Sequence, residues 1–189
     1  MLSYKCLKNQ AIKYLEYSLF PIQKHDIQLI RNWRNDQISV LRQQKIISAD
    51  DQEEYFKKNI WPQYASKNPT EILMGLYLNN ALIGYGGLVH ISWQDRRAEV
   101  SFLLDPKRMQ DFSLYEKDFY NYLILIKKLS NKELKFNRIY SETYAFRKEH
   151  ISILEKANFQ KEGTMRDHII HEGSPMDSVI HGLVFDHFS

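Results

Sequence analysis

Apolar and polar residues alternate most clearly over residues 72–104, and this pattern predicts three consecutive antiparallel strands. Asn79-Asn80 lies between the first two apolar runs, and asparagine is typical of tight hairpin turns because it tolerates a positive φ. The second run carries three glycines between residues 84 and 87, which favour a bulge or the close approach of another chain segment. The third run, residues 97–104, alternates strictly enough to present one apolar face. The stretch therefore predicts the centre of an antiparallel sheet.

Helical spacing of apolar residues and turn signals predict the elements around this centre. Helices are expected over residues 27–36, 48–61, 113–129 and 148–157, and further strands over 14–20, 139–143, 159–170 and 176–188. We expect Asp26 to cap the first helix and a capping box beginning at Ser113 to open the longest one. The whole predicts an α+β fold: an N-terminal extension (residues 1–12) and then one domain (residues 13–189). Its mixed, mainly antiparallel central sheet is flanked by about four helices.

Composition narrows the classes of function. The 189 residues suit one domain, and a net charge of +3 is too small for the dense basic face of a nucleic-acid-binding protein. The only cysteine, Cys6, excludes an internal disulfide, and the seven histidines do not follow a zinc-ligand spacing, so we expect no metal. The sequence shows no signal-peptide pattern and no apolar run of about 18 residues. We therefore expect a cytoplasmic protein without a membrane or nucleic-acid partner, either a monomer or a homodimer.

Five segments, in one order, resemble the GNAT superfamily of N-acetyltransferases, and most of all its branch of ribosomal-protein and amino-sugar acetyltransferases. Besides the three-strand centre, they are IRNWRND at 30–36, ISILEKANF at 151–159, EGTMR at 162–166 and DSVIHGL at 177–183. The resemblance covers roughly residues 14–188. It implies a single-domain GNAT-like fold and an enzyme that transfers acetyl from acetyl-CoA directly to a primary amine.

The resemblance also implies catalytic residues. Glu99, in the third central strand, is our candidate for the base that removes a proton from the amine; the alternative is a strand glutamate that pairs with Arg96 or Arg97 or faces water. Many relatives carry a tyrosine as the acid where this chain has Leu154. His150 and Tyr144 are the candidates that replace it, against the alternatives of a surface histidine and a packing tyrosine.

The cofactor loop departs from the family pattern. Relatives place a glycine-rich turn before the longest helix, so that backbone amides hold the pyrophosphate of coenzyme A. The matching residues 107–114 contain no glycine, and Asp111 is unfavourable for a phosphate. The residues expected to bind acetyl-CoA are Phe102, Leu103, Leu104, Lys107, Arg108, Met109, Gln110, Phe112, Ser113 and Leu114.

Three residues of the first predicted helix resemble those on the family's substrate side: Trp33, Arg34 and Asn35. Arg34 suits a substrate phosphate or carboxylate, because a guanidinium gives two parallel hydrogen bonds; an ion pair with Asp36 is the alternative. We favour a small-molecule amine, such as a nucleotide-linked amino sugar, over a protein N-terminus as acceptor. Because the loop lacks glycine and the tyrosine is missing, a catalytically inactive binding module with the same fold remains an alternative.

Overall fold

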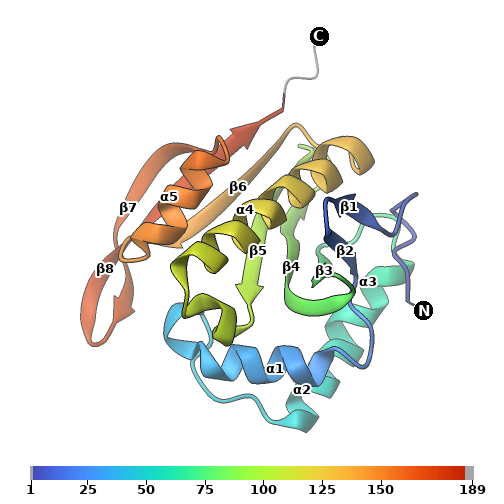
Figure 1. The fold of residues 1–189 in the computed structure, drawn as a ribbon, viewed down its shortest axis with the longest axis horizontal. Coiled ribbons are helices and arrows are strands. Elements are labelled where there is room, and N and C mark those ends of the chain that lie inside the picture. Colours follow the sequence, from blue (N-terminus) through green and yellow to red (C-terminus); the bar gives the residue numbers. More distant parts are fainter. Residues whose placement is uncertain (1, 186–189) are drawn as a thin grey trace.

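The computed structural model describes residues 2–185. The eight strands in this range form one sheet in the order β1-β2-β3-β4-β5-β6-β8-β7 (Figure 1). The strands are β1 (Ile12–Tyr14), β2 (Tyr17–Pro21), β3 (Ile72–Leu78), β4 (Ala81–Ser92), β5 (Arg97–Leu104), β6 (Arg138–Tyr144), β7 (Gln160–His171) and β8 (Ser174–Val184). Every neighbouring pair is antiparallel except β5 and β6, which are parallel. The predicted α+β class, with a mixed and mainly antiparallel sheet, is confirmed.

The helices are α1 (Ile27–Asp36), α2 (Ala49–Tyr55), α3 (Trp61–Ala65), α4 (Phe112–Lys128) and α5 (Lys148–Lys156). A π-helical turn, Phe56–Ile60, joins α2 to α3 without a break, so the predicted number of four helical units is correct. Figure 1 shows α4 crossing in front of the sheet, with α5 beside it over β6 and β8. None of the described helices combines the length and the apolar character that a membrane crossing requires.

The central hairpin forms as its sequence predicts. Asn79 and Asn80 turn the chain with φ values of 48° and 67°, in the left-handed region that asparagine tolerates. A Cβ on Gly86 would meet the Ser101 carbonyl oxygen at 2.1 Å, so the expected close approach at the strand glycines is also real. Here the buried hydroxyl of Tyr122, from α4, donates to the Ser101 carbonyl and accepts from the Gly87 amide. Helix α4 is thereby fixed against the sheet.

Three local predictions were wrong. Residues 14–20 are not one strand, because Leu15 takes a φ of 51° and turns the chain between β1 and β2. The Asp26 side chain makes no cap bond to α1; it accepts instead from the Gln23 amide and the Tyr77 hydroxyl. The N-cap of α4 is Asp111, not Ser113.

The first residues of the chain, predicted as an extension, pack onto the sheet. Tyr4 and Leu7 belong to the hydrophobic core. The Tyr4 hydroxyl accepts from the Leu73 amide at 2.8 Å and its ring stacks on Tyr64 at 4.0 Å. These residues therefore support β3 and α3.

The feature that positions the site is the short pairing of β5 with β6. Only residues 97–99 of β5 pair with residues 138–140 of β6, although both strands continue beyond them. The two strands diverge after Glu99, while beyond this point β5 stays paired with β4 and β6 stays paired with β8. A wedge-shaped gap thus opens within the sheet, and Glu99 lies at its narrow end.

Candidate active site

A cavity of about 230 Å³ occupies the wedge between β5 and β6. Its walls come from β5, β6, α4, α5 and the loop after α1, and include Glu99, Phe102, Phe119, Tyr144, Arg147 and His150. Phe102 stacks on Phe119 with ring centroids 4.5 Å apart, which gives the cavity an apolar floor. The wedge therefore combines an apolar floor with strand edges of β5 and β6 that do not pair with each other.

A larger cavity of about 920 Å³ adjoins the wedge on the side of α1 and α2. The two cavities share five lining residues: Arg34, Arg42, Val89, His90 and Ser101. The larger one is lined by the aromatic rings of Tyr55, Phe56 and Tyr85 and by the carboxylates of Asp51 and Glu71. Burial raises the pKa of the Glu71 carboxyl, and the nearby His90 lowers it by a smaller amount. Two molecules bound in the two cavities would therefore meet at the shared wall.

Glu99 lies at this junction with a side chain that is 12% exposed. Its Oε2 is 2.7 Å from Nδ1 of His90, and its Oε1 is 3.7 Å from Nη2 of Arg42. The alternatives of a pair with Arg96 or Arg97, or of a fully solvated carboxylate, are therefore wrong. Glu99 is a largely buried carboxylate inside a cleft, with a histidine as its closest charged or titratable partner.

His90 is a site residue that the sequence analysis missed. It lies where the register between β4 and β5 shifts, between Val89 and Ser92, and its φ is 50°. The extra residue of this bulge brings the imidazole next to Glu99. The hairpin pattern does not reveal this contact, because a bulge shifts the register that simple alternation would assign.

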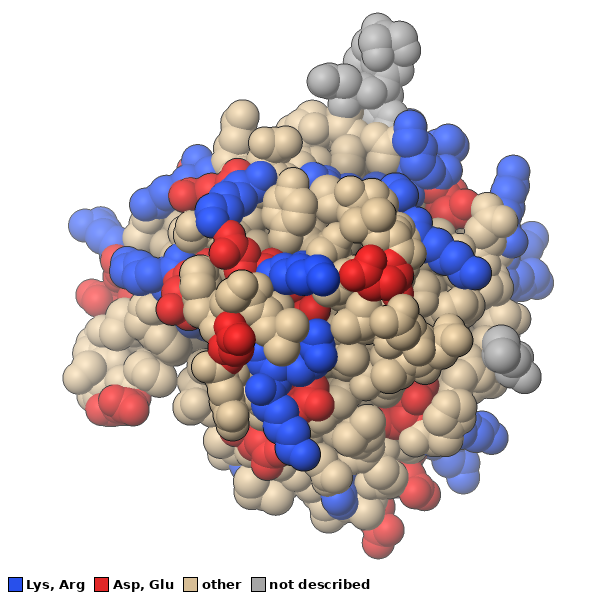
Figure 2. Space-filling model, in the orientation of Figure 1, with Lys and Arg blue, Asp and Glu red and all other residues tan. Residues whose placement is uncertain are grey.

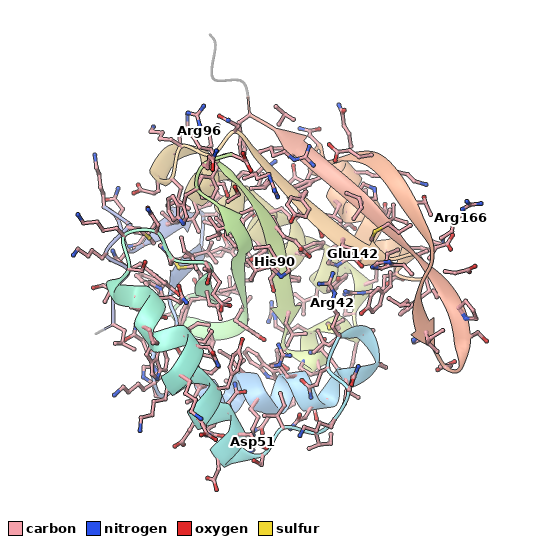
Figure 3. The ribbon with its side chains drawn as sticks, turned by 180° about the vertical axis from the view of Figure 1, so that it is seen from behind. Arg42, Asp51, His90, Arg96, Glu142 and Arg166 are labelled. Carbon is pink, nitrogen blue, oxygen red and sulfur yellow. The ribbon has the colours of Figure 1, made fainter. Side chains whose placement is uncertain are left out.

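Arg42 closes the cleft from the loop between α1 and α2, and it too was missed. Its Nη2 bonds to Glu142 Oε2 of β6 at 2.5 Å, so one guanidinium lies between carboxylates of two diverging strands. Figure 3 shows Arg42, Glu142 and His90 together in the middle of the sheet. The loop that carries Arg42 is fixed by Asn35, whose side chain binds the backbone of Ile47 through both its amide and its oxygen.

His150 is buried, which rules out a surface histidine. Its Nδ1 lies 2.6 Å from the Tyr115 hydroxyl and its ring stacks on Phe119 at 4.1 Å. Burial lowers the pKa of His150 well below its ordinary value, and Arg147 and His181 lower it further. This lowered pKa favours the neutral imidazole over the imidazolium that a general acid would use.

Tyr144, the other candidate acid, stands at the end of β6 and is half-buried in the wall of the wedge. Its ring packs against Phe146 with centroids 5.9 Å apart.

The predicted cofactor loop is held by internal contacts. Arg108 binds Asp118 through Nε at 2.6 Å and Nη2 at 3.1 Å, and Asp118 is fully buried. Asp111 accepts from the amides of Ser113 and Leu114, the groups expected to meet a phosphate. Lys107, Gln110, Phe112 and Ser113 are exposed, Met109 is half-buried, and Leu103 and Leu104 are buried. The loop therefore does not offer the pyrophosphate cradle that the family pattern implies.

Of the three predicted substrate residues, only Arg34 reaches the cavities. Its guanidinium donates to the Tyr85 hydroxyl at 2.8 Å and to Gln43 at 3.1 Å, not to Asp36. Trp33 is 4% exposed and belongs to the core. Asn35 is used to hold the loop after α1. We therefore keep Arg34 alone as an acceptor contact.

Comparisons with known proteins agree with this architecture. A family model for the acetyltransferase (GNAT) domain matches residues 19–180. The fold is similar to spermidine N-acetyltransferase from Vibrio cholerae solved with CoA and spermine, with a TM-score of 0.76 and 20% identity over 89% of this chain and 95% of that chain. It is also similar to the dodecameric form of that enzyme in an intermediate state, with a TM-score of 0.72 and 20% identity over 89% of this chain and 94% of that one. No curated protein matches the sequence.

The lowered pKa of His150 predicts a pH-dependent stability. Below about pH 6.5 the unfolded chain protonates this histidine and the folded chain does not, so the free energy of unfolding falls as the pH drops. The loss is up to about 1.4 kcal/mol per pH unit. Urea denaturation at about pH 7.5 and about pH 5.5 should show a smaller difference for His150→Gln than for the wild type. An equal difference in both proteins would contradict the assignment, and His25→Gln, at an exposed histidine, is the control.

Proposed function

The chain belongs to the GNAT acetyltransferase family, and we propose that it transfers acetyl from acetyl-CoA directly to a primary amine of a small molecule that enters through the larger cavity. One observation carries this proposal: the cavity in the wedge between β5 and β6 and the larger cavity next to it share a wall beside the Glu99–His90 contact. Direct transfer requires both reactants to be held together, and this arrangement provides for it.

Acetyl-CoA supplies an activated thioester, so the protein must mainly orient the reactants and manage protons. Phe102 would lie against the pantetheine arm, and the edge of β5 beyond Glu99, which does not pair with β6, would bind the arm's amides. Beyond the wedge, exposed Lys107 is the cation of residues 107–114 that remains for the phosphates, because Arg108 is bound to Asp118. Met109, Gln110 and Phe112 lie along the same route.

Glu99 would take part in the removal of a proton from the acceptor amine. An amine arrives at neutral pH as an ammonium ion and must lose a proton before it can react. The Glu99 carboxylate lies at the junction, bonded to His90, and would supply the negative charge that favours removal of that proton from the amine. Direct transfer also agrees with the state of Cys6: burial raises its pKa to about 11, and it lines neither cavity.

For the acceptor we favour an amine that carries an anionic group, of which a nucleotide-linked amino sugar is one example. Arg34 faces both cavities and its hydrogen-bond partners, Gln43 and Tyr85, are neutral, so its charge is available for a phosphate or carboxylate. Arg42 and Lys45 line the same larger cavity. The aromatic rings of Tyr55 and Tyr85 offer surfaces on which a base or sugar can pack.

A polyamine is the second candidate. Asp51 and Glu71 place two carboxylates in the larger cavity, and Glu71 is half-buried there. Carboxylates of this kind bind ammonium groups. The similar enzyme from Vibrio cholerae is a spermidine N-acetyltransferase, solved with spermine. The larger cavity contains both cationic and anionic side chains. An amine with an anionic group and a polyamine are therefore both candidate acceptors, and one experiment can compare them.

We predict that a panel of amines separates them. With acetyl-CoA as donor, the wild type should acetylate an amino sugar linked to a nucleoside diphosphate faster than spermidine. Arg34→Gln should raise KM for that acceptor about tenfold, equivalent to about 1.4 kcal/mol, and leave KM for acetyl-CoA unchanged. Arg31→Gln, on the same helix and outside both cavities, is the control. Faster turnover of spermidine would favour the polyamine; no acetylation of any amine would favour the inactive module.

We also predict that Glu99→Gln lowers kcat about 100-fold, in the range that a general base contributes. The substitution keeps the shape of the side chain and removes its charge, so KM for acetyl-CoA should change little. Steady-state kinetics with a thiol-detecting reagent gives both quantities. An unchanged kcat would remove Glu99 from the reaction.

A further inference from the structure

We infer that His90 is the residue that takes the proton from the acceptor amine, and that Glu99 acts as the residue that positions it. The inference rests on the proposed function and names the atom that performs its proton step. Three features support it: the hydrogen bond between His90 and Glu99, the β-bulge at His90, and the place of the His90 side chain in the walls of both cavities.

The hydrogen bond fixes the state of the imidazole. A carboxylate only accepts hydrogen bonds, so the 2.7 Å contact makes Nδ1 of His90 the N–H donor to Oε2 of Glu99. Nε2 then carries the free lone pair and is the nitrogen able to accept a proton. A buried carboxylate that orients an imidazole in this way also stabilises the imidazolium once it forms.

The position of the side chain suits this role better than that of Glu99. His90 lines both cavities, whereas Glu99 lines only the wedge. The imidazole is 61% exposed and the carboxylate 12%. An amine that arrives through the larger cavity therefore reaches the histidine before the carboxylate, and the proton can pass from the histidine to solvent.

The backbone at His90 forms a β-bulge and has a positive φ, and this conformation brings the imidazole to Glu99. The ladder steps from Val89↔Glu99 to Ser92↔Arg97, so β4 has one residue more than β5 in this interval. His90 takes a φ of 50°, a left-handed conformation that glycine adopts more readily. Bulges that redirect a side chain are frequent beside active sites, and here the bulge directs a histidine at the junction.

Charges of both signs face His90. Glu99 on β5 and Glu71 before β3 place negative charges near it, while Arg34 of α1 and Arg42 of the following loop line the same cavities and carry positive charges. Lys45 lines only the larger cavity.

The proton step balances without another reactant. The N–H bond of the acceptor ammonium breaks, its proton binds Nε2, and the electron pair stays on the amine nitrogen. When this pair forms the bond to the acetyl carbon, the carbon–sulfur bond of the thioester breaks and its electron pair leaves on the sulfur. The nitrogen loses its second proton to water, and the leaving thiolate takes one proton from water to become the thiol of coenzyme A. His90 becomes an imidazolium held by Glu99. It later releases the proton to water through its exposed side.

The test compares His90→Gln and Glu99→Gln with His25→Gln. His25 is the matched control, because it also lies beside a carboxylate, 3.3 Å from Asp26, but lines neither cavity. We expect His90→Gln to lower kcat about 100-fold, with KM for acetyl-CoA unchanged. We expect kcat/KM of the wild type to fall toward acid pH, and this fall should shift in His90→Gln and persist in the His25→Gln control.

A second variant, His90→Gly, guards against a folding defect, since glycine suits the left-handed backbone. This variant leaves space beside Glu99. Added imidazole should raise its kcat about tenfold or more above the value without imidazole. Full activity of His90→Gly without imidazole, alongside an inactive Glu99→Gln, would overturn the inference and make Glu99 the direct base. Loss of activity without imidazole rescue and with an unaltered pH profile would also overturn it. In both cases the proposed function stands, whereas a wild type that acetylates no amine ends both.

Discussion

The divergence of β5 from β6 is the constraint on which the rest of the structure depends. A parallel pair that continued past Glu99 would satisfy the backbone groups of both strands and leave no space in the sheet. Because the pairing of β5 with β6 stops after three residues, a cavity forms between the two strands. An extended ligand arm can lie there and bond to the strand edges that do not pair with each other. The flanking ladders and the Tyr122 hydroxyl between β4 and β5 keep this opening from collapsing.

Charge placement at the narrow end of the wedge follows from the same geometry. Diverging strands bring Glu99 and Glu142 near one another without a strand between them, and Arg42 lies between the two. One oxygen of Glu142 is buried without a hydrogen bond among the described residues. On the near face in Figure 2, by contrast, acidic and basic side chains are interspersed over the surface without one continuous patch. In the cleft, the carboxylates of Glu99 and Glu142, each 12% exposed, lie beside the same guanidinium of Arg42.

Much of the fold follows from local pattern, and the site largely does not. The hairpin at Asn79-Asn80 depends on neighbouring residues alone, so its sequence suffices. Trp33 and His150 are ordinary residues of amphipathic helices, and only tertiary packing decides that both are buried. The sequence analysis considered Asp111 only as a negative charge that is unfavourable for a phosphate. In the structure its side chain accepts hydrogen bonds from two amides and makes it the N-cap of α4. His90 becomes visible only with the bulge, because strict alternation cannot place the side chain of an inserted residue.

The most direct measurement is a calorimetric titration of the protein with acetyl-CoA. The account predicts a micromolar Kd, about −8 kcal/mol, because the wedge and the exposed Lys107 hold the donor despite the capped start of α4. Binding should be lost in a variant that fills the wedge, Ser101→Trp, if circular dichroism shows that this variant is folded. No binding up to millimolar acetyl-CoA by the folded wild type would contradict the account, and would leave a GNAT fold whose cleft serves another ligand.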